Sequence, residues 1–289
     1  MRALIADQFP QWAALPVRQV LPGGWDNRTF RLGDELSVRL PSSDGYLQQV
    51  EKEQRWLPVL APLLPLQIPE PVARGVPSAG FPRPWSVYRW IDGEPVSADS
   101  AGNASSLAFG VARFMNALRR IDPIGGPAPG EHNFWRGAHP EVYASQVDDA
   151  LAALGDTVDV EGARDVWRTT MRARSQRRVW FHGDIAPGNL LLREGELAAV
   201  IDFGTSGVGD PACDLAIAWS VFGGAARASF RTGLGAWWDD ELWARGRGWA
   251  IWKALIVAAG SAGAHDPQAE AARARRAISE IIADHRATG

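Results

Sequence analysis

The sequence contains one cysteine, two lysines and no long apolar run. Cys213 has no second cysteine with which to form an internal disulfide. The longest apolar stretch, residues 254–259, is far shorter than the roughly 20 residues that a membrane-spanning helix needs. Asp7 follows a four-residue apolar run that is too short for a secretory signal. These absences predict a cytoplasmic chain with no membrane partner.

Neither sign of charge dominates the sequence. The 30 basic and 33 acidic residues leave a formal charge of -3, so no overall field favours a nucleic-acid partner. Lysine occurs only as Lys52 and Lys253, and any role that needs an ammonium group therefore has two candidates. Apolar residues make up 46% of the 289 positions, which excludes a disordered or fibrous chain. At roughly 150 residues per domain, this length suggests about two domains.

Residues 1–91 carry strand patterns and one helical pattern. Short alternating or β-branched runs flank the tight-turn dipeptide Gly33-Asp34 and predict a hairpin. The region 61–84 holds seven prolines, and we expect it to follow the surface in extended form. Pro58 is expected to make the last helical turn irregular. The expected elements are strands at 28–32, 35–40 and 85–91 and a helix at 45–60.

Residues 92–289 carry mainly helical patterns, with apolar side chains at three- and four-residue steps. The clear β element of this part is a pair of strands at 178–192 and 197–203. The sequence therefore predicts an α+β fold, with a small β-rich unit followed by a larger, mostly helical one. The expected helices of the second unit are 107–118, 143–154, 241–259 and 268–285.

The segment 181–204 carries the strongest chemical signal. If the dipeptide at 194–195 forms a two-residue hairpin loop, Asn189 lies opposite Val200. Asp202 is two residues beyond Val200 and therefore on the same face of the sheet. An amide oxygen and a carboxylate are hard ligands that suit Mg²⁺ and leave sites for water or phosphate. The spacing predicts a metal-phosphate site at the open end of the hairpin.

Asp184 lies five residues before Asn189, in a loop that contains Gly183 and Gly188. Its carboxylate can approach the same point without being a metal ligand, and it can accept a proton. Phosphoryl transfer needs a positioned nucleophile, a carboxylate that orients or deprotonates it, and cations on the phosphate oxygens. The segment supplies the carboxylate and the metal ligands for that chemistry.

This segment resembles the aminoglycoside phosphotransferase and choline-kinase-like family of small-molecule kinases, whose fold is similar to that of eukaryotic protein kinases. The resemblance implies a bilobal protein-kinase-like fold, with a nucleotide-binding lobe at 1–91 and a catalytic, substrate-binding lobe at 92–289. It also implies that Asp184 is the catalytic base and that Asn189 and Asp202 hold Mg²⁺. The pattern that carries the resemblance is His182-Gly183-Asp184, Asn189 and Ile201-Asp202-Phe203-Gly204.

The same resemblance gives structural roles to residues just after this segment. Asp210 and Asp214 would support the catalytic loop from below. Cys213 stands between them and is expected to be a buried small side chain rather than a reactive thiol.

The resemblance places phosphate contacts in the N-terminal lobe. Gly23 and Gly24 look like part of a phosphate-covering hairpin, in which glycine lets backbone amides approach a nucleotide. Arg39 stands at the strand position where such kinases have a lysine that holds the phosphates. Arginine keeps the charge and offers a fork to phosphate oxygens, but it is bulkier. Glu53 is implied as its helix partner, and Glu51 is the alternative.

Residues 85–93 resemble the interdomain hinge, whose backbone near Arg89 and Ile91 would bind the adenine edge. The resemblance thus implies transfer of the γ-phosphoryl group of ATP or GTP to a hydroxyl of a small molecule, such as an aminoglycoside antibiotic. The loop 131–136 either folds over that acceptor or simply joins two helices. Several acids could attract a cationic acceptor, although solvated helix faces explain them more simply: Asp148, Asp149, Asp156, Asp159, Glu161, Asp239, Asp240 and Glu241.

Three other functions compete with this interpretation. A non-catalytic nucleotide-binding module would explain Arg39 but leaves Asp184 without a purpose. A metal-dependent hydrolase could use His182 as a ligand, yet the five histidines lack metal-ligand spacing. A protein kinase needs a peptide-docking segment, whereas only residues 205–208 separate the two motifs. The sequence sets neither the acceptor nor the oligomeric state.

Overall fold

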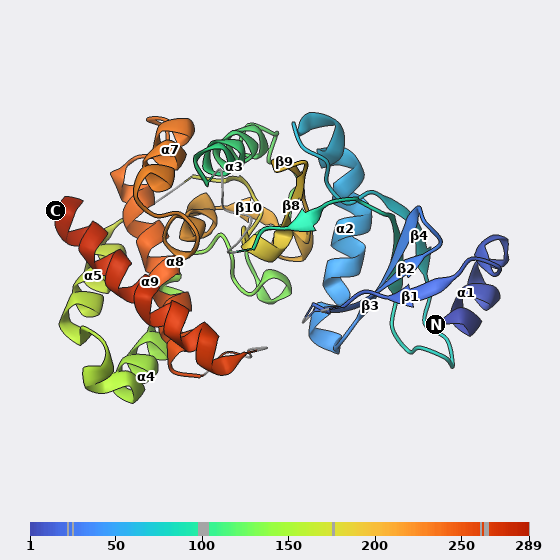
Figure 1. The fold of residues 1–289 in the computed structure, drawn as a ribbon, viewed down its shortest axis with the longest axis horizontal. Coiled ribbons are helices and arrows are strands. Elements are labelled where there is room, and N and C mark those ends of the chain that lie inside the picture. Colours follow the sequence, from blue (N-terminus) through green and yellow to red (C-terminus); the bar gives the residue numbers. More distant parts are fainter. Residues whose placement is uncertain are drawn as a thin grey trace.

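An antiparallel five-stranded sheet forms one end of the molecule (Figure 1). The computed structural model describes residues 1–21, 23–24, 26–97, 104–174, 177–260, 262 and 266–288. The strand order in the sheet is β1-β2-β3-β5-β4. The strands are β1 (Val17–Gln19), β2 (Asn27–Leu32), β3 (Leu36–Pro41), β4 (Pro71–Gly75) and β5 (Trp85–Arg89).

The β2–β3 hairpin confirms the turn predicted at residues 33–34. Gly33 has a φ of 61°, a conformation that glycine adopts without the steric cost of a Cβ atom, and Leu32 pairs with Leu36 across the loop. The inner side chains of the sheet form their own apolar cluster, in which Val38 is fully buried. Helix α1 (Arg2–Gln8) adds Leu4 and Ile5 to that cluster.

Helix α2 (Leu47–Leu60) lies between the sheet and the helical part of the chain (Figure 1). It continues as an α-helix through Pro58 to Leu60, so the irregular turn expected at Pro58 lies instead just after the helix, in the 3-10 turn Ala61–Leu63. Leu57 and Leu60 are buried in the large apolar cluster of the helical part, together with Tyr88 of the sheet. The helix thereby joins the two parts of the molecule.

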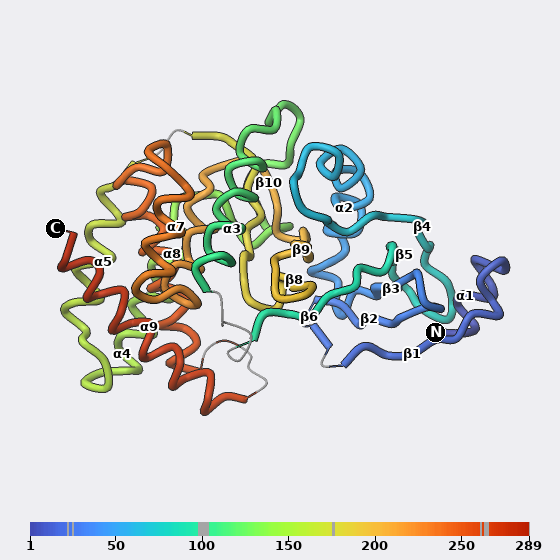
Figure 2. The backbone as a smooth tube through the Cα atoms, turned by 45° about the horizontal axis from the view of Figure 1, so that its top comes forward, coloured from blue at the N-terminus to red at the C-terminus, as the bar shows by residue number. Residues whose placement is uncertain are grey.

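The remainder is mostly helical, which confirms the predicted fold class. Helix α8 is buried around most of its circumference and packs against α4, α5 and α9, so it forms the centre of this part. Figure 2 shows the chain leaving the sheet along β5 and entering the helical part through β6 (Glu94–Pro95). The helices are α3 (Ala104–Leu118), α4 (Ala144–Leu154), α5 (Val160–Arg172), α6 (Ile217–Ser220), α7 (Gly224–Leu234), α8 (Asp240–Ala258) and α9 (Pro267–Thr288).

Two small β ladders lie between the sheet and the helices. Strand β8 (Leu190–Arg193) pairs with β6 on one side and with β9 (Glu196–Val200) on the other. Strand β7 (Val179–Phe181) pairs with β10 (Gly207–Gly209). The strand expected at 178–192 is therefore two strands, because the intervening loop bends away from the ladder to present its polar side chains.

Two further expectations need correction. The proline-rich region is not extended throughout, because it begins with the 3-10 turn Ala61–Leu63. Its extended part includes β4, which pairs with β5 with an irregularity between Pro71 and Ala73 that accommodates the proline. Helices α5 and α7 have no counterpart among the expected elements.

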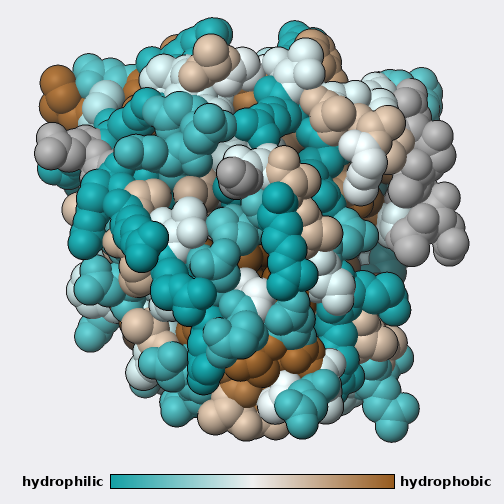
Figure 3. All heavy atoms as spheres, turned by 90° about the vertical axis from the view of Figure 1, so that its left-hand side faces the viewer, coloured by the Kyte–Doolittle hydropathy of each residue, from teal (hydrophilic) through white to brown (hydrophobic). Residues whose placement is uncertain are grey.

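The outer face of the helical part is mostly hydrophilic (Figure 3), as solvated helix faces require. None of the described helices combines the length and the apolar character needed to cross a membrane.

The contact between Gly75 and Trp85 gives a test of the sheet packing. A Cβ atom on Gly75 would lie 1.9 Å from Cε2 of Trp85, which is fully buried. We expect Gly75→Ala to lower the free energy of unfolding by about 1–3 kcal/mol, because the indole has no space into which to move. Urea denaturation measures the change. The control is Gly80→Ala, whose Cβ atom would meet nothing closer than Ser78 Oγ at 3.8 Å. Equal stability of the two variants would contradict the packing argument.

Candidate active site

The β8–β9 hairpin has the predicted turn but not the predicted register. Glu194 and Gly195 have φ values of 54° and 82°, which is the signature of a two-residue hairpin turn. Arg193 pairs with Glu196 as expected. A bulge then shifts the ladder by one residue, so that Leu190 rather than Asn189 lies opposite Val200. The expected register is wrong beyond the bulge, because an extra residue in one strand leaves no trace in its apolar pattern.

The bulge changes how Asn189 and Asp202 reach the site. The carbonyl of Asn189 accepts a hydrogen bond from the Ile201 amide at 2.9 Å, so Asn189 ends the ladder. Its side-chain Nδ2 donates to the Asp184 carbonyl at 2.9 Å and to Asp184 Oδ2 at 3.1 Å. Asp202 follows the other strand with a φ of 69° and is half-buried. The structure thus brings Asp184 and Asn189 into direct contact.

His182 fixes the start of this loop and is fully buried. Its Nε2 lies 3.1 Å from the Ile201 carbonyl, and its Nδ1 accepts a hydrogen bond from the Asp184 amide at 3.2 Å. A carbonyl only accepts and an amide only donates, so the ring is neutral with its proton on Nε2. Both ring nitrogens are therefore occupied, which argues against His182 as a metal ligand in a hydrolase.

Asp214 holds the backbone of the loop that begins at His182. Its two carboxylate oxygens accept hydrogen bonds from the backbone amides of His182 at 2.8 Å and Gly183 at 2.7 Å. Burial raises the pKa of Asp214, while the contact with these amides opposes that rise. The carboxylate fixes the two residues that precede Asp184.

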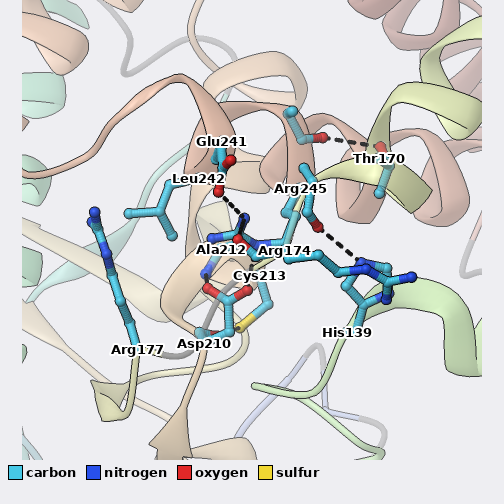
Figure 4. A network of polar contacts seen from close by, with 12 residues as sticks. His139, Thr170, Arg174, Arg177, Asp210, Ala212, Cys213, Glu241, Leu242 and Arg245 are labelled. Atoms are coloured by element: carbon cyan, nitrogen blue, oxygen red, sulfur yellow. Dashed lines mark hydrogen bonds and ion pairs between the residues drawn. The ribbon is translucent and has the colours of Figure 1, made fainter.

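Asp210 fixes the segment that carries Asp214. It pairs with the buried Arg245 of α8, with Nε and Oδ2 2.5 Å apart (Figure 4). Cys213 lies beside Asp210 and is buried, and burial raises the pKa of its thiol well above the ordinary value. It is therefore a small core side chain, as expected.

Arg39 of β3 joins the sheet to Asp202. Its guanidinium lies 2.7 Å from Asp202 Oδ1 and 3.5 Å from Glu53 Oε1. Burial opposes its charge, but these two carboxylates outweigh burial and raise the pKa of Arg39. Glu53 also accepts a hydrogen bond from the Tyr88 hydroxyl at 2.5 Å, whereas Glu51 is exposed. Glu53, and not Glu51, therefore pairs with Arg39 in this structure.

Lys52 is a site residue that the sequence analysis missed. Its Nζ donates to the Gly204 carbonyl at 2.6 Å and the Ser206 carbonyl at 3.0 Å, and it lies 3.2 Å from His132 Nδ1. Burial lowers the pKa of Lys52 to about 7. The signal in the sequence was the scarcity of lysine, since one of only two lies here.

The loop 131–136 does more than join two helices. His132 contacts Lys52 of α2, and the Phe134 ring packs edge-on against Tyr46 at 5.9 Å between centroids. Arg136 Nε donates to the Gly183 carbonyl at 3.0 Å. The loop therefore connects the N-terminal part of the molecule to the segment that carries Asp184.

The remaining predicted nucleotide contacts lie around the sheet. Gly23 and Gly24 lie in the β1–β2 connection, whose Trp25 is outside the described residues. A Cβ atom on Gly23 would meet nothing within 4 Å, which leaves space beside this backbone. The Arg89 amide already donates to the Glu70 carbonyl at 2.9 Å, so it is not free for an adenine edge. Ile91 lies just beyond β5 and is half-buried.

Asp26 is a second residue that the sequence analysis missed. Burial, together with the charges of Asp202 and Asp184, raises the pKa of Asp26 to about 6, despite the opposing charge of Arg39. Tyr46 hydrogen-bonds to its side chain. Three carboxylates therefore face one region between the sheet and the loop that carries Asp184.

The raised pKa of Asp26 predicts a pH dependence of stability. The folded chain keeps the Asp26 proton up to about pH 6, whereas the unfolded chain loses it near 3.8. The stability that Asp26 contributes is therefore full below about pH 3.8 and is lost as the pH rises through 6. We expect Asp26→Asn to gain about 1–2 kcal/mol over the natural protein between pH 4 and pH 7. Urea denaturation of both proteins at each pH measures this; a pH-independent difference would contradict the assignment.

The donor set at this region suits Mg²⁺. No three His, Cys, Asp or Glu side chains form a metal-ligating group in the part of the chain that the structure describes. Mg²⁺ needs few protein ligands, because it keeps several waters and binds substrate phosphates. The carboxylate of Asp202 and the amide oxygen of Asn189 are hard donors. The charges of Asp202 and Asp184 add to burial, the larger cause, in raising the pKa of Asp26. These residues fit a divalent cation.

A cavity of about 280 Å³ opens beside Asp184. The loop at 183–187 forms one wall, and helices α8 and α9 form others. Three tryptophans contribute to the lining, namely Trp219, Trp249 and Trp252. The cavity lies where a molecule could present a hydroxyl to the Asp184 carboxylate.

Comparison with known proteins identifies a family and a fold. The chain matches the model of the phosphotransferase enzyme family over residues 17–249. The GDP and kanamycin complex of APH(2")-IIia has a TM-score of 0.75 with 20% identity, covering 98% of both chains. The macrolide 2'-phosphotransferase MphH from Brachybacterium faecium has a TM-score of 0.60 with 19% identity, covering 91% of this chain and 92% of that one. No curated protein matches the chain.

The family model covers most of the chain, and the chain therefore belongs to the phosphotransferase enzyme family. The structural likeness confirms the predicted kinase-like fold. Family membership supports phosphoryl transfer as the general activity.

Proposed function

We propose that this protein transfers the γ-phosphoryl group of ATP or GTP to a hydroxyl group of a small molecule. The observation that carries the proposal is the contact between Asp184 and Asn189, at the mouth of a cavity and on a loop fixed by Asp214. That arrangement gives an aligned carboxylate beside a donor set that suits Mg²⁺. The proposal takes residues 1–91 as the nucleotide-binding lobe and 92–289 as the catalytic lobe.

In the proposed reaction, Asp184 orients the acceptor hydroxyl and takes its proton. The hydroxyl oxygen forms a bond to the γ-phosphorus, and the bond from that phosphorus to the bridging oxygen of the β-phosphate breaks. The nucleoside diphosphate leaves with the electron pair of the broken bond. Little covalent chemistry is required of the protein, so positioning and charge provide most of the rate enhancement.

The nucleotide is proposed to bind between the sheet and the catalytic loop. Arg39, which pairs with Glu53, would contact phosphate oxygens. Gly23 and Gly24 would offer backbone amides to the phosphates, and the backbone near Arg89 and Ile91 would meet the adenine edge. Because the Arg89 amide is already used, Ile91 is the better candidate for that contact.

Asn189 and Asp202 would hold Mg²⁺ in this scheme. The cation supplies charge neutralisation of the phosphate oxygens when it is bound. In the structure, Arg39 provides positive charge next to Asp202, and that charge lowers the pKa of Asp202 against the effect of burial. Asp202 therefore stays ionised and ready to bind a cation at neutral pH.

Nucleotide binding tests the proposal without knowledge of the acceptor. The purified protein is titrated with ATP and with GTP by calorimetry, in the presence and absence of Mg²⁺. We expect binding that strengthens with Mg²⁺, and Asp202→Asn should remove most of that Mg²⁺ dependence. A protein that binds neither nucleotide would overturn the proposal and favour a kinase-like scaffold without chemistry.

A further inference from the structure

We infer that the acceptor is an apolar, ring-containing alcohol whose charge, if it has one, is negative, rather than a polyamine such as an aminoglycoside. The inference rests on the proposed function, because it takes the cavity beside Asp184 as the acceptor site. It names the chemical class that this cavity selects.

Aromatic rings define the shape of the cavity. Trp249 and Trp252 meet edge to face, with ring centroids 5.6 Å apart. Tyr143 stacks on Trp252 at 4.0 Å and an interplanar angle of 17°, which holds that indole in place. Trp219 is buried and forms another part of the lining. Rigid rings of this kind favour a flat apolar molecule, since burial of apolar surface is their main contribution to binding.

The charges on the cavity lining are mainly positive. Arg136, Lys253 and Arg273 contribute cations, whereas Asp184 and Glu270 contribute the carboxylates. Asp184 is the proposed base and faces the reacting hydroxyl, which leaves one carboxylate against three cations. A ligand with several ammonium groups would bring like charges together at this lining.

Two of these cations have room for an anionic ligand group. Neither Lys253 nor Arg273 forms an ion pair within 4 Å with any residue that the structure describes. Arg136 differs from these two, because its guanidinium lies 5.0 Å and 4.9 Å from the ring centroids of Trp249 and Trp252. The side chains of Lys253 and Arg273 are exposed at the lining, so a carboxylate or another negative group on the ligand can pair with them.

The acids that could have attracted a cationic acceptor do not line this cavity. Asp159 pairs with Arg286 at 2.7 Å, and Glu161 pairs with Arg164 at 2.9 Å. The acids near the start of α8 are likewise engaged, since Asp240 pairs with Arg231 at 2.7 Å. Asp148, Asp149 and Asp156 are exposed to solvent away from the lining. The acidic surface is therefore neutralised or solvated, and it does not form the acceptor site.

A matched set of ligands tests the inference. The probes are naphthylmethanol, its carboxylate derivative and its aminomethyl derivative, which share one ring system and one hydroxyl. Each is titrated into the full-length protein by calorimetry, and kanamycin is added as a competitor. We expect the carboxylate derivative to bind at least about tenfold more tightly than the aminomethyl derivative, with naphthylmethanol between them and no displacement by kanamycin. Equal or tighter binding of the aminomethyl derivative, or displacement by kanamycin, would overturn the inference.

Variants of the cavity lining assign the charge preference to a residue. Lys253→Gln should reduce the preference for the carboxylate derivative several-fold, and Lys253→Arg should retain it. The matched control is Arg276→Gln, an exposed position on α9 that does not line the cavity. An unchanged preference in Lys253→Gln would show that the charges described here do not set the selectivity.

Measurements on one protein preparation distinguish a failure of this inference from a failure of the proposed function. Nucleotide binding with Mg²⁺ is measured beside the ligand titrations. Intact nucleotide binding and phosphorylation of kanamycin would overturn the acceptor class alone. An intact charge preference without any nucleotide binding would overturn the phosphotransferase function alone.

Discussion

Replacing Asp184 by asparagine is expected to lower kcat for phosphoryl transfer by roughly 10²–10⁴-fold, the range that a general base contributes. Asparagine cannot accept the proton of the acceptor hydroxyl. It does preserve the shape of the side chain, and the Asn189 amide can still donate to the backbone carbonyl of residue 184. The loop should therefore keep its conformation, and nucleotide affinity should change little. Steady-state turnover and calorimetric titration of the same variant measure both quantities.

The control for this variant is Asp148→Asn, an exposed aspartate on α4. It makes the same chemical change far from the cavity and should leave kcat unaltered. Full turnover in Asp184→Asn would show that another group accepts the proton. A parallel loss of nucleotide binding would instead show that Asp184 acts by holding the loop.

Removal of the Arg39 side chain is expected to cost both stability and nucleotide affinity. In Arg39→Ala, the buried carboxylate of Glu53 and the half-buried one of Asp202 lose their shared cation. Removing one partner of a buried ion pair typically lowers the free energy of unfolding by about 3–5 kcal/mol. The variant also lacks the charge that is proposed to contact the phosphates. Urea denaturation measures the first effect, and calorimetry with nucleotide and Mg²⁺ measures the second.

Two further variants separate charge from shape at this position. Arg39→Lys keeps the positive charge but loses the planar fork, so we expect it to recover part of both properties. Arg28→Ala removes an exposed arginine from the neighbouring strand β2 and should change neither. If Arg39→Ala binds nucleotide as tightly as the natural protein, the phosphate contact lies elsewhere, and Lys52 becomes the next candidate.

The catalytic segment shows how far sequence reasoning reaches. The turn at 194–195, the hairpin and the closeness of Asp184 to Asn189 followed from local spacing, because a tight turn fixes the residues that flank it. The bulge did not follow from the sequence. It depends on how β8 meets its partner strands, and the apolar pattern on either side of it looks like an uninterrupted strand.

Contacts between residues far apart in the sequence explain why the partner of Arg39 was left undecided and why Asp26 and Lys52 were missed. Glu53 and Glu51 are the same type of residue on the same helix. Only the packing of α2 against the sheet brings Glu53 next to Arg39. Asp26 and Lys52 had no assigned role, because their environments come from Asp202 and from the backbone at 204 and 206.

The sequence alone determined the class of fold and the chemistry that its polar motif can perform. Both depend on short-range patterns, namely helical periodicity, turn dipeptides and the spacing of Asp184, Asn189 and Asp202. Only the tertiary structure decided which charges surround the cavity beside Asp184. Lys253 and Arg273 come to it from two separate helices, whereas Asp159 and Asp240 pair with arginines elsewhere. The physical reason is that the charge preference of a cavity depends on all of the charged side chains around it. Tertiary packing determines which side chains those are.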